Sequence, residues 1–123
     1  MRNTLGALVV ACVGLLSQPG AIIAHHGAAT FDTTTEVTVK GTVTGWTWAN
    51  PHCILRVDVT GTDGTVTNWS VATSNIADVS KRGWSRRSFK PGDVVTLTIQ
   101  PAKSGAPVGM IRNVVLPDGT KLQ

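Results

Sequence analysis

From residue 36 onward, apolar and polar residues alternate with a period of two, which predicts strands with one buried face. Between Glu36 and Val43, for example, every second residue is a valine or a glycine, and threonine or lysine lies between them. Residues 25–35 lack this periodicity and are expected to form an arm that leads into the first strand. The alternation predicts five strands, at residues 36–48, 52–60, 66–72, 94–100 and 109–116.

Turn-forming residues separate the predicted strands. The sequence Gly-Thr-Asp-Gly at residues 61–64 predicts a hairpin between the second and third strands. Ser74 is expected to cap a short helix over residues 75–81, because its side-chain oxygen can accept hydrogen bonds from first-turn amides. Gly83 is expected to end that helix.

The order of these elements favours one architecture. Five strands with a short helix between the third and the fourth is the order of an OB-type barrel, whose long first strand bends to serve both sheets. We therefore predict an all-β fold with one short helix, a small five-stranded OB-like barrel. A sandwich or another small barrel stays an alternative, because element order alone does not determine strand pairing.

The N-terminal segment has a different pattern. Arg2 precedes an apolar run at residues 5–16, and Ser17-Gln18-Pro19-Gly20 breaks that run before Ala24. A secretory signal peptide has this order, and the run is too short for a spanning helix. We predict a signal peptide at residues 1–24, a single OB-like domain at residues 25–123, and a periplasmic or secreted protein. A lipoprotein-like box ending at Cys12 is the alternative.

Cysteine and charge narrow the possible functions. After cleavage the chain would keep only Cys53, which alternation places on an apolar face as a buried residue. Five basic residues cluster at Lys81, Arg82, Arg86, Arg87 and Lys90. They could face an acidic ligand or anionic lipid, although a solvated surface is the commoner explanation. We expect no nucleic-acid partner and no membrane association after signal cleavage; the physiological partner is left open.

The candidate chemistry lies in three histidines. Cleavage after Ala24 would give His25 a free α-amine, and an amine and an imidazole on one residue can chelate a transition metal. His52, in an Asn50-Pro51-His52 turn, would add a third nitrogen and complete a set that suits Cu(II), with His26 as an alternate ligand. An untethered terminus and a turn histidine bonded to backbone explain the same residues without a metal.

Two tryptophans precede this turn. Trp46 and Trp48 share the parity of Thr42 and Thr44, which places both indoles on the outer face unless a bulge at Gly45 shifts the register. On the outer face they would form a ligand surface together with Asn50. With a bulge they would belong to the core.

Several short motifs together resemble a known family. They are His25-His26-Gly27, Trp48-Ala49-Asn50-Pro51-His52, Lys90-Pro91-Gly92-Asp93 and Leu116-Pro117-Asp118-Gly119. The chain resembles small exported bacterial proteins described as a domain of unknown function, number 6152. The resemblance implies an exported small β-barrel and supplies no catalytic residues to transfer.

These observations favour a binding module over an enzyme. The sequence contains no Gly-x-Ser-x-Gly, His-Glu-x-x-His, Cys-x-x-Cys or phosphate-loop motif. The primary hypothesis is an exported binding module whose candidate ligand is Cu(II), held by the N-terminal histidine site. The alternatives are a metal-free domain that binds a small molecule or a protein, and a copper-dependent oxidoreductase that uses the same ligands.

Overall fold

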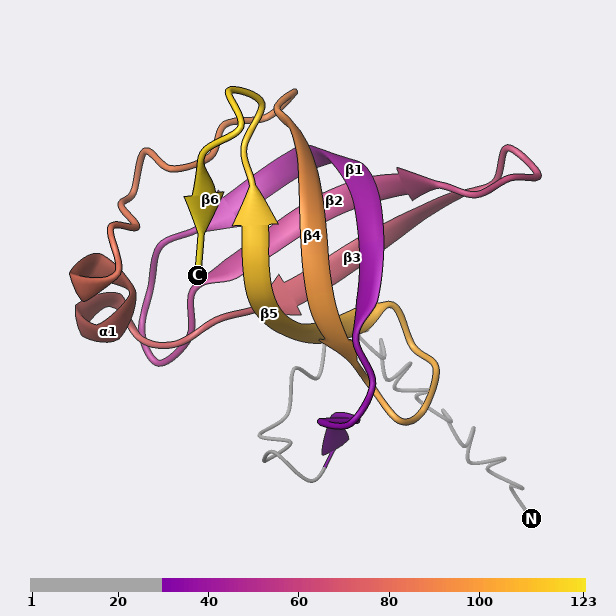
Figure 1. The fold of residues 1–123 in the computed structure, drawn as a ribbon, viewed down its shortest axis with the longest axis horizontal. Coiled ribbons are helices and arrows are strands. Elements are labelled where there is room, and N and C mark those ends of the chain that lie inside the picture. Colours follow the sequence, from indigo (N-terminus) through magenta and orange to yellow (C-terminus); the bar gives the residue numbers. More distant parts are fainter. Residues whose placement is uncertain (1–29) are drawn as a thin grey trace, which may run out of the picture.

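A single sheet that closes on itself forms the protein (Figure 1). The computed structural model describes residues 30–123. Its strands are hydrogen-bonded in the order β3-β2-β1-β4-β5-β6, and an additional parallel pairing of β3 with β5 closes the barrel. The elements are β1 (Val37–Thr47), β2 (Ile54–Thr60), β3 (Val66–Ala72), α1 (Ile76–Lys81), β4 (Val94–Pro101), β5 (Val108–Val115) and β6 (Lys121–Leu122).

This architecture confirms the predicted all-β fold, a small five-stranded OB-like barrel with one short helix. Strands β1 to β5 match the five predicted segments to within two residues at each end. Strand β6, which is only two residues long and pairs with the end of β5, was not predicted. Two residues carry no readable periodicity, so alternation gives no signal for such a strand.

The long strand β1 serves two neighbours. Its first half pairs with β4, from Val37 opposite Ile99 to Thr42 opposite Val94, and its second half pairs with β2 as far as Thr47. Where the partners change, Gly41 is buried, and a Cβ atom there would lie 2.8 Å from the carbonyl oxygen of Asp58. The bend of β1 therefore brings two backbones closer than a side chain permits.

A β-bulge follows directly in β1. Val43 lies opposite Val57, but Gly45 lies opposite Arg56, so that Thr44 is an extra residue. Beyond the bulge, Trp46 faces Leu55, whose side chain is fully buried. Because directly opposed residues in an antiparallel pair share a face, Trp46 points toward the core. The bulge named in the sequence analysis is present, and it reverses the parity that regular alternation would give.

The barrel interior is filled by aliphatic side chains from every long strand. Leu55, Leu97 and Ile99 are the largest fully buried side chains. Cys53 is free and fully buried, which confirms its predicted place among the core residues. Val79 of α1 and, after the helix, Trp84 and Phe89 complete the same core cluster.

The helix begins one residue later than predicted. Asn75, not Ser74, is its N-cap, and the Asn75 Oδ1 atom accepts a hydrogen bond of 3.0 Å from the Asp78 amide. Ser74 instead donates its hydroxyl to Asp78 Oδ2, and this bond is the main reason that the pKa of Asp78 is lowered. Both residues are good caps, so composition could not choose between them. Gly83 ends the helix with a φ of 87°, as expected.

No helix in the described part of the chain is long and apolar enough to cross a membrane.

The arm before β1 is tied to the barrel by backbone bonds. Phe31 forms a β-bridge with Ala102, and the Lys103 amide donates to the carbonyl oxygen of Thr30 at 3.0 Å. Asp32 then turns the chain into β1, because its Oδ1 atom accepts from both the amide and the hydroxyl of Thr34, at 3.0 Å and 2.7 Å. These bonds lower the pKa of Asp32 to about 2, with the Thr34 hydroxyl contributing most.

Two glycines of β1 provide a matched test of the bend. Gly41→Ala should lower the free energy of unfolding by about 1–3 kcal/mol, because the new methyl group meets a carbonyl oxygen that cannot move freely. Gly45→Ala should leave stability unchanged or raise it slightly, since a Cβ atom there meets nothing within 4 Å. Denaturant unfolding followed by tryptophan fluorescence measures both. Equal destabilisation by the two variants would contradict the close approach at Gly41.

The Asp32 turn predicts a pH dependence. Nuclear magnetic resonance titration of the Asp32 carboxyl should give a pKa of about 2, and Thr34→Val should raise it toward the ordinary value of 3.8. Since the folded-state pKa lies below the unfolded value, the contribution of Asp32 to stability is present above pH 3.8 and is lost as pH falls through about 2. Asp32→Asn should remove this part of the acid dependence. An unchanged Asp32 titration in Thr34→Val would refute the assigned cause.

Candidate functional site at the turn between β1 and β2

The turn that carries His52 is attached to the segment between β3 and α1. The Cys53 amide donates to the carbonyl oxygen of Ser74 at 3.1 Å, and the Thr73 amide donates to the carbonyl oxygen of Cys53 at 2.9 Å. The Asn50-Pro51 peptide bond within the turn is cis. In Figure 1 the turn lies beside α1 at one side of the barrel.

His52 is exposed but held in place. Its Nδ1 atom lies 3.1 Å from the carbonyl oxygen of Thr73, a residue that is 3% exposed. A carbonyl oxygen can only accept a hydrogen bond, so Nδ1 is the donor in this contact. In the neutral imidazole the lone pair then resides on Nε2, which has no hydrogen-bond partner within the described residues. The site therefore presents one oriented nitrogen donor at the surface.

Asn50 holds the turn to the helix. Its Oδ1 atom accepts a hydrogen bond of 3.0 Å from the amide of Ile76, the first residue of α1. First-turn amides have no partner inside the helix, so a side chain from a distant turn satisfies one of them here. The side chain of Asn50 thus has a structural contact in addition to its predicted place on a ligand surface.

Trp46 and Trp48 are half-buried rather than fully exposed. Both pack against the core cluster, and their ring centroids lie 5.8 Å apart. Trp46 also contacts Trp84 and Phe89, with centroid distances of 5.9 Å and 5.0 Å. The exposed part of each indole still contributes to the surface, which leaves their role in ligand binding a prediction.

The other predicted metal ligands, His25 and His26, lie outside the described residues. Within residues 30–123, His52 is the single histidine, and no group of three His, Cys, Asp or Glu side chains could hold a metal ion. The described chain begins at Thr30, whose carbonyl oxygen accepts from Lys103 in the loop between β4 and β5, whereas His52 contacts Thr73 in the segment before α1. The structure thus places one of the three proposed ligands.

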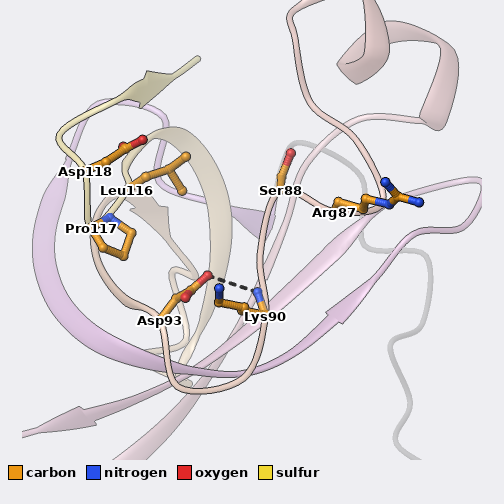
Figure 2. Close-up of a pocket in the computed structure, with 7 residues that line it drawn as sticks. All are labelled: Arg87, Ser88, Lys90, Asp93, Leu116, Pro117 and Asp118. Atoms are coloured by element: carbon orange, nitrogen blue, oxygen red, sulfur yellow. Dashed lines mark hydrogen bonds between the residues drawn. The ribbon is translucent and has the colours of Figure 1, made fainter.

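The described residues also form two surface hollows. One, of about 410 Å³, is lined by Arg82, Lys121 and Gln123. The other, of about 290 Å³, is shown in Figure 2 and is lined by Arg87, Ser88, Lys90, Asp93, Leu116, Pro117 and Asp118. Within the second hollow, the Asp93 carboxylate accepts a hydrogen bond of 3.0 Å from the Lys90 amide (Figure 2). Both hollows border the basic cluster found in the sequence.

The backbone hydrogen bond expected for His52 in the absence of a metal is present, but the two groups that position His52 and its turn could not be identified from the sequence. One is the main-chain carbonyl of Thr73, which no side-chain pattern can reveal. The other is the contact between Asn50 and the amide of Ile76, which lies 26 residues further along the chain and leaves no signal in the sequence.

The protein is thus a small OB-like β-barrel whose β1–β2 turn, which carries His52, is hydrogen-bonded to the segment before α1. The model of a family of unknown function, DUF6152, matches residues 11–112. The chain belongs to this family, as its motifs indicated. A comparison with curated proteins finds no match.

The role of Asn50 can be tested with two substitutions. Asn50→Ala should lower the free energy of unfolding by about 0.5–1.5 kcal/mol, because the Ile76 amide loses its acceptor. Asn50→Asp should stay close to the parent protein, since a carboxylate accepts the same bond and favours a helix N-terminus. Thermal unfolding followed by circular dichroism measures both. Equal stability of the alanine variant and the parent would show that water replaces the bond without cost.

Proposed function

We propose that the protein is an exported binding module and that its ligand is a Cu(II) ion bound at the turn between β1 and β2. The α-amine and Nδ1 of His25 and the Nε2 atom of His52 would hold the ion, with His26 as the alternate ligand. The observation that supports this most directly is the hydrogen bond from His52 Nδ1 to the Thr73 carbonyl oxygen. Metal-binding histidines usually donate their second nitrogen to a carbonyl or carboxylate in this way.

Hydrogen bonds to a buried residue hold His52 in an orientation suited to binding a metal ion. Thr73 is buried, and its amide and its carbonyl oxygen both bond to the turn. Its hydroxyl accepts from Arg82 Nη2 at 3.4 Å. An imidazole held by a buried residue loses little additional freedom when it binds an ion, which favours affinity.

The donor types favour copper. The proposed set contains nitrogen only, and imidazole and amine nitrogens in tetragonal arrangements suit Cu(II). The neighbouring thiol does not compete, because Cys53 is fully buried and its Sγ atom contacts the carbonyl oxygen of Ala49 at 3.6 Å. An N-terminal amine has a pKa of roughly 7.7–8.0, so protons compete only mildly at neutral pH.

The proposed site requires that the N-terminal arm reach from the loop between β4 and β5 to His52. A path from Ala102 across β5 and β3 reaches β2 at Arg56, four residues beyond His52. Because Phe31 of the arm pairs with Ala102, four strand spacings of ~4.8 Å and four residues at a rise of ~3.3 Å separate the arm from His52, a diagonal of roughly 23 Å over the surface. Five residues from His25 to Thr30 span at most roughly 17 Å, and both histidine side chains add reach. The site therefore requires a nearly extended arm.

Electron paramagnetic resonance tests the site. The protein should be produced with its leader, exported, shown by mass spectrometry to begin at His25, and loaded with one equivalent of Cu(II). We expect an axial, nitrogen-rich signal that changes in His52→Ala, because that variant removes the nitrogen donated by the barrel. The matched variant His26→Ala should leave the signal unchanged.

The opposite pattern would overturn the barrel site. If His26→Ala alters the signal and His52→Ala does not, any copper is held by the terminus alone.

The half-buried indoles support a second candidate, a metal-free domain that binds a small molecule or a protein through Trp46 and Trp48. Copper binding unaffected by His52→Ala would favour this candidate. A copper-dependent oxidoreductase differs from both, because it must produce hydrogen peroxide from oxygen and a reductant faster than free Cu(II) does.

A further inference from the structure

The charge of the described chain is unevenly distributed. Residues 81–90 contain five of its ten Lys and Arg residues and no Asp or Glu. The rest of the described chain has five Lys and Arg against seven Asp and Glu. A strongly positive segment thus lies on a body with a small negative charge, which concentrates the positive field at one place.

Two buried aromatic residues hold this segment on the barrel. Trp84 and Phe89 are 3% and 5% exposed, and the Trp84 indole donates to the carbonyl oxygen of Gln123 at 3.0 Å. The Trp46 indole donates to the carbonyl oxygen of Ser85, also at 3.0 Å. All five cationic residues of the segment are exposed: Lys81, Arg82, Arg86, Arg87 and Lys90. The aromatic anchors therefore turn the charges outward.

The cations of the segment are not neutralised by ion pairs. Within residues 30–123 the one salt bridge joins Arg112 to Glu36, at 3.6 Å and outside the segment. Three acids nevertheless lie near the segment. The pKa of Asp78 is lowered mainly by the Ser74 hydroxyl and also by the charges of Lys81 and Arg82, while Asp93 and Asp118 line a hollow with Arg87 and Lys90. They offset part of the positive charge, and the segment keeps a net positive charge that is available to a partner.

The kind of partner follows from what the segment lacks. Its only large apolar residues are the two buried aromatics, so it offers no apolar centre of the kind found in protein interfaces. It also presents no exposed aromatic ring on which nucleic-acid bases stack. Charge alone remains as the means of recognition. The segment and α1 project from one side of the barrel, opposite the β2–β3 hairpin (Figure 1), and can approach a flat surface.

We propose that residues 81–90 form a docking surface for the headgroups of an anionic phospholipid membrane. Lys121, which lines a hollow together with Arg82, adds a sixth cation at its border. The contact is peripheral and electrostatic, and it does not depend on copper binding. Such docking contradicts the expectation from the sequence that the processed protein does not associate with membranes.

The strength of such a contact scales with the number of charges. Each Lys or Arg near an anionic bilayer strengthens binding by about fivefold, so that removing two should weaken it by about 25-fold. The attraction should also fall steeply with salt, because the screening length is only about 10 Å at 0.1 M ionic strength.

Co-sedimentation with vesicles tests the proposal. The exported protein is mixed with vesicles of equimolar phosphatidylglycerol and phosphatidylcholine, or of phosphatidylcholine alone. We expect binding to the first only, and a loss of about 25-fold in Arg86→Gln/Arg87→Gln. The control Lys40→Gln/Lys103→Gln removes the same net charge from exposed positions elsewhere and should change binding by less than about twofold. Near-ultraviolet circular dichroism verifies that both variants are folded.

Four results would overturn the docking surface. They are absence of binding to the anionic vesicles, equal binding to phosphatidylcholine alone, an equal loss in the two double variants, and tighter binding to a DNA duplex than to the vesicles with the same dependence on Arg86 and Arg87.

Discussion

The double pairing of β1 is the constraint on which the rest of the structure depends. One strand must pair with β4 over its first half and with β2 over its second, and it can do so only by bending. The bend leaves no room for a side chain at Gly41, and it is followed by a bulge in which Thr44 is an extra residue. The β1 residues after the bulge are shifted by one position, so that Trp46 faces the core rather than solvent.

The consequences of this shift extend to both surfaces of interest. Turned inward, Trp46 packs on Trp84 and Phe89 and bonds to the carbonyl oxygen of Ser85. That cluster holds the basic segment against the barrel. The same strand then ends in the turn whose His52 bonds to Thr73. The β1–β2 turn and the chain that follows α1 thus lie on the same side of the barrel (Figure 1).

The chain belongs to a family of unknown function, and a fold alone does not determine function, which depends on the residues of the site. Copper binding and membrane docking depend on different interactions. Copper binding depends on a few oriented nitrogen atoms and tolerates salt, whereas membrane docking depends on summed charge and does not. The β1–β2 turn and residues 81–90 can therefore be altered separately, and one surface can fail its test without affecting the other.

The sequence by itself determined the strands, the hairpin at residues 61–64, the helix end at Gly83 and the burial of Cys53, because each depends on local alternation or local backbone preference. Local patterns could not decide whether Ser74 or Asn75 caps the helix, because both are good caps. They also could not predict β6, because two residues show no periodicity. Only the tertiary structure decided the orientation of Trp46, the tautomer of His52 and the outward display of the basic cluster. These depend on a one-residue bulge, a distant main-chain carbonyl and buried aromatic anchors, and contacts between residues far apart in sequence leave no periodic signal in the chain.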